Sequence, residues 1–319
     1  MQKPVMLLVL AAVGGGGWFF LQQYRIDGLD RLKLRPRDGS AESTNAPDEQ
    51  TPGGTKRAVR IGSYKLRDFG LVQLGQPRTM KVLTEVVGSF DVLALEGLSE
   101  NSGEALRALV EQVNAQGRHY DVALGAADGR QTNSRDAFLF DTDRLEVDRS
   151  ALYSVADPDR LLAHPPLVGW FRVRGLSVEH AFTFTLMTVS STAAEQDALA
   201  AAYRAVRDDG RGEDDVILLG DFGADDRHLG PLAQIPRFAA AISAVPTNTQ
   251  GDRQTDNIVF SRSATEFTGR SGVLDVIRHF NLTVAEALAV SDHMPVWAEF
   301  GAYEGGEAGG LARRPQSLR

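Results

Sequence analysis

Between residues 57 and 300 this chain alternates apolar runs of strand length with stretches that carry apolar residues at helical spacing. Asp91–Leu95 and Asp215–Leu219 are short, nearly continuous apolar runs, which are typical of strands buried on both faces. Helical patterns follow Pro77 and occupy Glu195–Val206. Many short strands with helices between strand pairs predict a four-layer α/β sandwich, in which two mixed β-sheets pack face to face and helices cover their outer faces.

Composition divides the rest of the chain. Residues 36–56 contain Pro, Gly, Ser, Thr and acidic residues with almost nothing apolar, which is typical of a flexible linker. The Gly-rich residues 301–319 predict a disordered tail. We therefore expect an N-terminal signal anchor or signal peptide over 1–24, a linker over 25–56 and one folded domain over 57–300.

The net charge of -8 argues against a broad nucleic-acid-binding surface, because phosphate contacts require clustered Lys and Arg. A local basic cleft remains compatible with this charge. The absence of cysteine excludes disulfides and thiolate metal sites. The acidic stretch Glu213–Asp215 is interpreted as part of a solvated helix end and loop.

The segment Ser291-Asp292-His293 lies near the C-terminus and precedes an apolar run. Histidine titrates near neutral pH, and a carboxylate can orient it as a general base. Asp256, at the start of another predicted strand, is the expected carboxylate partner of His293, as in triad chemistry. Asp221 follows the buried run Asp215–Leu219 and is a third candidate catalytic residue.

The order of these motifs resembles the DNase I-like endonuclease/exonuclease/phosphatase superfamily across nearly the whole body. The resemblance implies a magnesium-dependent phosphodiesterase. It implies that His293 acts as the base, that Asp256 orients it and that Asp221 positions the nucleophile. It also implies that Asp292 lies near the metal.

Four positions depart from the pattern of that superfamily. Lys65 stands in place of an Asn at the end of the first strand, and Ser190 in place of a phosphate-binding His. Gly223 replaces the Asn that follows the Asp of the fourth motif. The chief magnesium-binding Glu is replaced by Gly97, with a carboxylate one residue earlier at Glu96. Because one residue of shift turns a strand side chain to the opposite face, Glu96 is expected to substitute only if the strand has ended there.

Two interpretations of the site follow, beside a third in which the domain is a purely structural surface module. The first is a degenerate domain, a pseudoenzyme with weak or no activity, that binds a phosphorylated ligand, nucleic acid or a partner. Lys65 would then act as an internal counter-ion for Asp221, Asp292 or Glu96. The second is an active Mg-dependent enzyme with a rearranged site, in which Glu96 and Asp292 join Asp221 as the carboxylates and His293 acts with Asp256.

The uncharged run Pro4–Leu21 is about long enough to span a bilayer. Without a clean small-residue cleavage site, a retained signal anchor is favoured over a removed signal peptide. The basic residues that follow the run favour a cytoplasmic body, whereas the habit of the resembled superfamily favours export. We expect a membrane-anchored domain whose body is exported to the periplasm or the cell surface.

Overall fold

A computed structural model describes residues 58–126, 134–177, 181–211 and 213–304, all within the unit Thr55–Arg319. The predicted anchor and linker lie outside these residues. Among the described residues, no helix has the length and apolar character needed to cross a membrane.

The strands are β1 (Ala58–Phe69), β2 (Val92–Ser99), β3 (Tyr120–Leu124), β4 (Ser134–Asp141), β5 (Leu145–Ser154), β6 (Leu167–Val173), β7 (Thr183–Ser190), β8 (Val216–Asp221), β9 (Phe238–Ala240), β10 (Asp256–Ser261), β11 (Phe267–Val273) and β12 (Val296–Gly301). The helices are α2 (Leu71–Leu74), α3 (Pro77–Val87), α4 (Gly103–Asn114), α5 (Gln196–Arg207), α6 (Val276–His279) and α7 (Val284–Val290), with short 3-10 turns at Ala193–Glu195 and Gly230–Gln234.

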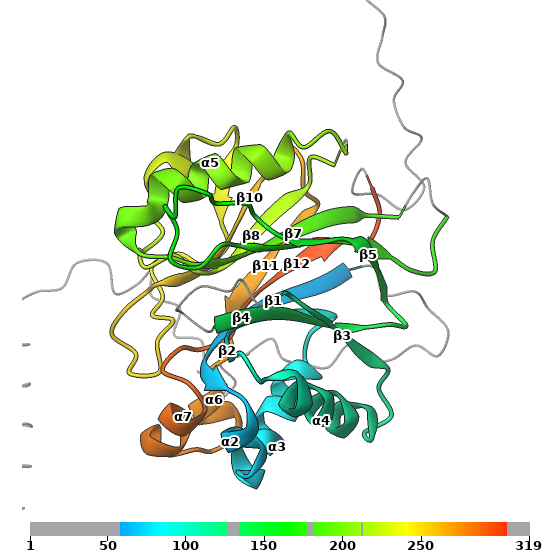
Figure 1. The fold of residues 1–319 in the computed structure, drawn as a ribbon, viewed down its shortest axis with the longest axis vertical. Helices are drawn as coiled ribbons and strands as arrows, with labels where there is room; N and C mark the ends of the chain where they lie inside the picture. The colour runs from blue at the N-terminus through cyan, green and yellow to red at the C-terminus, as the bar shows by residue number, and fades with distance from the viewer. Residues whose placement is uncertain (1–57, 127–133, 178–180, 212, 305–319) are drawn as a thin grey trace, which may run out of the picture. The chain divides into compact units, whose positions relative to one another are not determined.

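Two mixed sheets of six strands each form the centre of the described domain. The first has the order β11-β12-β1-β2-β4-β3, and the second has the order β5-β6-β7-β8-β10-β9. In each sheet one central pair is parallel, β1 with β2 and β7 with β8, and the neighbouring pairs are antiparallel. Figure 1 shows α5 on the outside of the second sheet and the other helices on the outside of the first.

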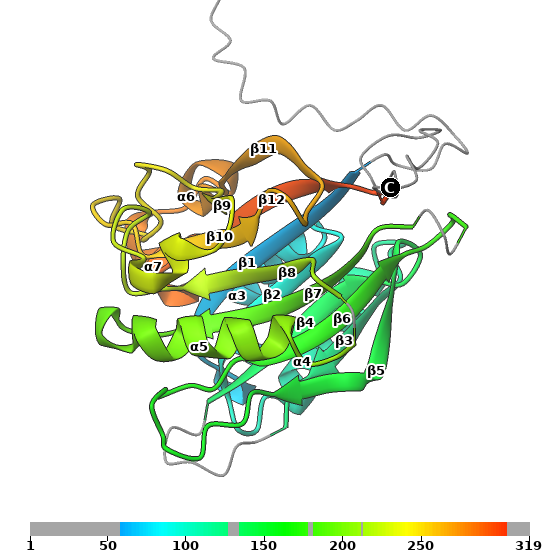
Figure 2. The same ribbon diagram turned by 90° about the horizontal axis from the view of Figure 1, so that it is seen from above.

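Alternating side chains of the central strands explain why these runs are apolar throughout. In β2, Val92 and Ala94 face the space between the sheets, whereas Leu93 and Leu95 pack under the outer helices. Both faces are therefore covered, as expected for central strands of a sandwich. The outer side of the second sheet is covered in the same way by α5, which lies lengthwise in front of that sheet in Figure 2.

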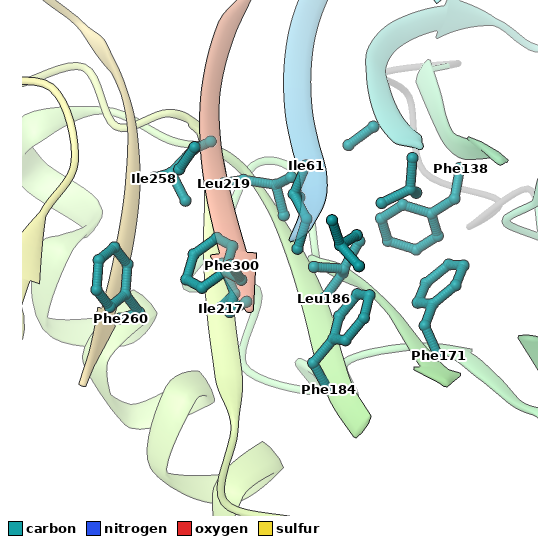
Figure 3. Close-up of a cluster of buried hydrophobic side chains, with 14 of the residues drawn as sticks. Ile61, Phe138, Phe171, Phe184, Leu186, Ile217, Leu219, Ile258, Phe260 and Phe300 are labelled. Atoms are coloured by element: carbon teal, nitrogen blue, oxygen red, sulfur yellow. The ribbon is translucent and has the colours of Figure 1, made fainter. Parts of the chain in front are cut away.

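A group of phenylalanines fills the space between the sheets (Figure 3). The ring of Phe171 makes an edge-on contact with the ring of Phe138, with 5.4 Å between the ring centroids. It stacks on the ring of Phe184, with 5.6 Å between the centroids. Phe300, from β12, meets Phe260 at 5.2 Å. This core joins the two sheets, and the predicted four-layer sandwich is confirmed.

The folded body extends four residues beyond the predicted boundary at residue 300. β12 ends at Gly301, Ala302 is fully buried, and Tyr303 pairs with Ala181. The predicted tail therefore begins too early, because Gly301 still pairs with Ala58 of β1. The residues after Glu304 lie outside the described part of the chain.

Candidate active site

The predicted site residues come from both sheets and meet at one end of the sandwich. Parallel pairing brings together the ends of β1 and β2 in one sheet and of β7 and β8 in the other. β10 runs antiparallel to β8, so Asp256 at its start pairs in register with Asp221 at the end of β8. The residues just before β12 lie at the same end, because Val296 pairs with Ser63.

His293 and Asp256 form the carboxylate–imidazole pair expected from the sequence. His293 Nδ1 lies 3.0 Å from both carboxylate oxygens of Asp256. The hydroxyls of Thr247 and Thr255 donate to Asp256 Oδ2 at 2.8 and 3.0 Å. Ser291 Oγ accepts from the main-chain N–H of His293 at 2.9 Å. These contacts fix the imidazole with Nε2 turned toward the cleft, as a general base requires.

The electrostatic surroundings favour a protonated His293. Burial alone would lower its pKa, but the hydrogen bond and charge of Asp256, together with the charge of Asp221, outweigh burial and raise the pKa. Its Nε2 lies 4.0 Å from Asp221 Oδ2, and its side chain is 15% exposed. The imidazole of His293 is therefore partly accessible and lies between two carboxylates.

Lys65 reaches across from the first sheet to the second. Its Nζ lies 2.6 Å from Asp221 Oδ2, while the main-chain N–H of Gly223 donates to Asp221 Oδ1 at 3.0 Å. Ser190 is the register partner of Asp221 at the end of β7. The predicted counter-ion contact is thus made with Asp221. Burial would lower the pKa of Lys65, but the carboxylates of Asp221, Glu96 and Asp256 raise it, so the ammonium form is stabilised.

Glu96, on β2, is the register partner of Lys65 on the neighbouring strand β1. β2 continues through Glu96, which shares the inner face with Val92 and Ala94, so the continuing strand turns its side chain toward the other sheet. Glu96 is fully buried, and Ser63 Oγ donates to its Oε1 at 2.9 Å. Its Oε2 has no hydrogen-bond partner in the described part of the chain. Burial, followed by the charge of Asp136, raises the pKa of Glu96 well above its ordinary value.

A β-bulge explains why a glycine stands at residue 97, where the resembled superfamily has its chief magnesium-binding Glu. Leu95 and Leu98 both face the outer helices although only two residues lie between them, and the pairing of β2 with β4 shifts register there. Gly97 has φ +72, and a Cβ at this position would lie 2.0 Å from the carbonyl oxygen of Leu66. The left-handed conformation and the close backbone both require glycine here.

Asp136 joins the site although the sequence did not identify it. Thr188 donates to its Oδ2 at 2.6 Å, and the main-chain N–H of Gly97 donates to the same carboxylate. Burial raises the pKa of Asp136 to about 6 against these hydrogen bonds. Asp136 lies in no local sequence motif. The pairing of β4 with β2 is what brings it to the site.

Asp292 is adjacent to His293 in the chain, but its carboxylate turns to the surface. Its side chain is 46% exposed, and Oδ2 lies 3.1 Å from a guanidinium nitrogen of Arg67. Burial acts against the shift, but a backbone hydrogen bond and the charges of His293 and Arg67 lower the pKa of Asp292. The structure therefore does not bring Asp292 together with Glu96 as a pair of metal ligands.

A cavity of about 720 Å³ opens beside the site. Gly223, two residues after Asp221, and Thr255, directly before Asp256, form part of its wall. Its lining carries both signs of charge, with Arg227 and Arg253 beside Asp225, Asp226 and Asp252.

The residues present do not fit a divalent cation in this arrangement. Asp221, Asp256 and His293 each offer a ligand atom, and these atoms lie within 4.8 Å of one another. However, Lys65 already binds Asp221, and two threonine hydroxyls already bind Asp256. Glu96 is not among the residues whose ligand atoms converge here, and its Oε1 accepts from Ser63 Oγ.

Comparison with known proteins agrees with this geometry, although no family model matches the sequence. Mouse deoxyribonuclease-1-like 2 is 25% identical over 257 residues, which cover 76% of this chain and 92% of the mouse protein. Human deoxyribonuclease gamma is 26% identical over 261 residues, which cover 75% of this chain and 85% of the human protein.

A solved structure of an endonuclease/exonuclease/phosphatase family protein from Bacteroides thetaiotaomicron has the same fold, with a TM-score of 0.51 at 16% identity. The match covers 76% of this chain and 97% of the bacterial one. The two packed sheets have the DNase I-like fold, and the sequence similarity to deoxyribonucleases supports the resemblance to the endonuclease/exonuclease/phosphatase superfamily.

Proposed function

We propose that this chain is a DNase I-like domain with weak or no metal-dependent phosphodiesterase activity, whose cleft binds a phosphorylated ligand. The 2.6 Å contact between Lys65 Nζ and Asp221 Oδ2 carries the proposal. The ammonium group neutralises a carboxylate that would otherwise attract a metal. Two like charges about 4 Å apart repel by roughly 4 kcal/mol at an effective dielectric constant of 20, and a divalent ion is repelled more strongly.

The same residues suit a phosphate group. Lys65 and His293 both face Asp221, and their side chains are 26% and 15% exposed. Charge-assisted hydrogen bonds from ammonium and imidazolium groups to phosphate oxygens are stronger than neutral ones. A phosphorylated ligand would bind without the phosphate-binding His and the Asn that Ser190 and Gly223 replace.

Hydrolysis assays test the catalytic half of the proposal. The full chain is incubated with double-stranded DNA, bis(p-nitrophenyl) phosphate and phosphoinositides, each with Mg²⁺ or Mn²⁺. We expect turnover close to the background, because a missing transition-state donor typically lowers the rate by about a hundredfold. Robust turnover that disappears in His293→Ala would overturn the proposal, since it would require an intact catalytic base.

Calorimetry with inorganic phosphate and with a 5′-phosphorylated dinucleotide tests the binding half. Lys65→Gln should weaken binding, whereas Lys81→Gln is a matched control, because Lys81 is exposed on α3. Equal affinities in the two variants would contradict a role for Lys65. A salt-dependent loss common to both variants would indicate non-specific attraction instead.

A second candidate is an active metal-dependent phosphodiesterase with a rearranged site. Two observations favour it: the convergence of ligand atoms from Asp221, Asp256 and His293, and the unpartnered Oε2 of Glu96 within the described residues. In this case Lys65 would have to leave Asp221 before the ion binds. Glu96→Gln should then abolish Mn²⁺ binding measured by calorimetry, and an unchanged isotherm would count against this candidate.

We propose that residues 1–24 tether the domain to a membrane with the body exported. The uncharged run Pro4–Leu21 supports this proposal. Membrane fractionation and protease accessibility of intact cells are the tests. Recovery of the full chain in the soluble fraction would contradict tethering, and protection of the body from external protease would contradict export to the cell surface.

A further inference from the structure

Three consecutive carboxylates gather at the end of the second sheet away from the candidate active site. Glu213, Asp214 and Asp215 precede β8, whereas Asp221 is the last residue of that strand. Each of the three offers an oxygen, and these oxygens lie within 4.8 Å of one another. At ~3.3 Å per residue, the strand separates this cluster from Asp221 by roughly 20 Å. The cluster is therefore distinct from the cleft.

Asp215 is buried, which corrects the interpretation of this stretch as solvated. Its relative exposure is 2%, and its Oδ1 has no hydrogen-bond partner among the described residues. Its carbonyl oxygen accepts from the main-chain N–H of Thr185 at 2.9 Å, so β7 holds it in place. A buried carboxylate oxygen without a donor is unfavourable unless a proton or a cation satisfies it.

Neighbouring groups orient the cluster. Trp170 Nε1 donates to Glu213 Oε2 at 3.0 Å, and the main-chain N–H of Asp215 donates to Glu213 Oε1 at 3.1 Å. Each carboxylate oxygen of Glu213 keeps lone-pair capacity beyond these single bonds. Donors outside the ligand sphere commonly fix carboxylate ligands in this way.

Two further acids approach from distant parts of the chain. The pairing of Tyr303 with Ala181 brings Glu304 to the start of β7, where the main-chain N–H of Thr183 donates to its carboxylate. Glu304 and Glu266 are both close enough to Asp215 to interact with it electrostatically. Acidic side chains from three parts of the chain therefore surround a buried acceptor.

We propose that Glu213, Asp214 and Asp215, with Glu304 beside them, bind a calcium ion. Ca²⁺ takes six to eight oxygen ligands at about 2.3–2.6 Å, so ligand oxygens on one ion lie up to about 5 Å apart. The spacing within the cluster meets this limit. An all-carboxylate set without His favours a hard cation over zinc, and Mg²⁺ demands a stricter octahedron. Such an ion joins the start of β8 to the segment that follows β12.

Calcium titration of the full chain tests this site. We expect Ca²⁺ to bind with a one-to-one stoichiometry in calorimetry and to raise the Tm of the domain. Asp215→Asn should weaken the affinity by at least about tenfold, because affinity follows the number of charged ligands. Glu304→Gln is a second variant that leaves the buried strand intact and should weaken binding less. Asp208→Asn is the control, since Asp208 is exposed and pairs with Arg207.

Terbium luminescence provides a positional readout. Tb³⁺ replaces Ca²⁺ at oxygen sites, and the indole of Trp170 lies against Glu213 close enough to sensitise its emission. We expect sensitised emission that Ca²⁺ displaces, that Trp170→Phe removes and that Trp297→Phe retains. Absence of Ca²⁺ binding at millimolar concentration, or binding that is the same in Asp215→Asn and wild type, would overturn the site. These readouts do not depend on hydrolysis and so stand apart from the proposed function of the cleft.

Discussion

Lys65 Nζ and Asp221 Oδ2 lie 2.6 Å apart and connect the two β-sheets at the candidate active site. Lys65 belongs to β1 in one sheet, and Asp221 ends β8 in the other. The pair therefore has two consequences. It places a protein cation at the carboxylate on which the catalytic chemistry of the resembled superfamily depends. It also joins the two sheets by an ion pair, beside the hydrogen bond from Thr188 to Asp136.

Replacing Lys65 with Met should destabilise the domain. The substitution leaves Asp221 next to Glu96 and Asp256 without its cation, and all three carboxylates are buried. We expect a loss of about 2 kcal/mol, which lies between the values for exposed pairs and for fully buried ones. Urea unfolding of the full chain measures the change in the free energy of unfolding.

The double variant Lys65→Met/Asp221→Asn is the control for this prediction. Removing both charges should recover part of the loss, because the uncompensated carboxylate is removed together with its partner. If the losses of the two single variants simply add in the double variant, the two side chains are not coupled, and the prediction is wrong.

His293 should titrate above the ordinary histidine pKa of about 6.5. Its pKa is raised by Asp256 and Asp221 against the effect of burial. The stability that its protonation contributes is fully present below the pKa of the unfolded state and is lost as the pH rises through the higher folded pKa. NMR titration of the His293 ring measures the midpoint.

Asp256→Asn should lower that midpoint, because it removes both the hydrogen bond and the charge that face Nδ1. His279 is the internal reference, since it lies in α6 and outside the groups that shift the pKa of His293. A His293 midpoint that does not move in Asp256→Asn would contradict the assignment of Asp256 as its orienting partner.

Glu96→Gln should make the domain more stable at neutral and alkaline pH. The folded pKa of Glu96 is raised by burial and by Asp136, so the folded state binds its proton more tightly than the unfolded state does. Stability therefore falls as the pH rises from about 4.3 through the folded pKa. Gln removes this slope and keeps the contact with Ser63. Unfolding free energies measured across this pH range should diverge with rising pH, and parallel curves would count against a raised pKa.

The sequence predicted the sandwich because its central strands are buried on both faces. Asp91–Leu95 is apolar after its first residue, and its short length favours a strand over a helix. β5 and β11 were not predicted, because both lie at sheet edges and carry exposed polar residues, such as those of Asp148–Ser150, that hide the alternation. A local pattern identifies a strand only where packing makes the pattern uniform.

The site was predicted only where its residues sit in ordered motifs. The pairing of His293 with Asp256 followed from two such motifs. Thr247 and Asp136 lie in no motif. A loop contact brings Thr247 to Asp256, and strand pairing brings Asp136 to Glu96. Sequence spacing cannot reveal such contacts, because they depend on the register between strands distant in the chain.

Restoring a carboxylate at residue 97 should fail to restore a metal site. Gly97 has φ +72, and a Cβ there would lie 2.0 Å from the carbonyl oxygen of Leu66. Gly97→Glu is therefore expected to destabilise the domain and to confer no Mg²⁺-dependent hydrolysis.

Gly97→Ala isolates the backbone effect, and Gly117→Ala is its matched control, since Gly117 has φ +81 with nothing within 4 Å of the added atom. Urea unfolding should give a loss of about 1 kcal/mol at residue 117 from conformation alone, and about 3 kcal/mol at residue 97, where a clash is added. Equal losses at the two positions would mean that the bulge relaxes, and that the missing ligand at residue 97 reflects side-chain identity and not backbone geometry.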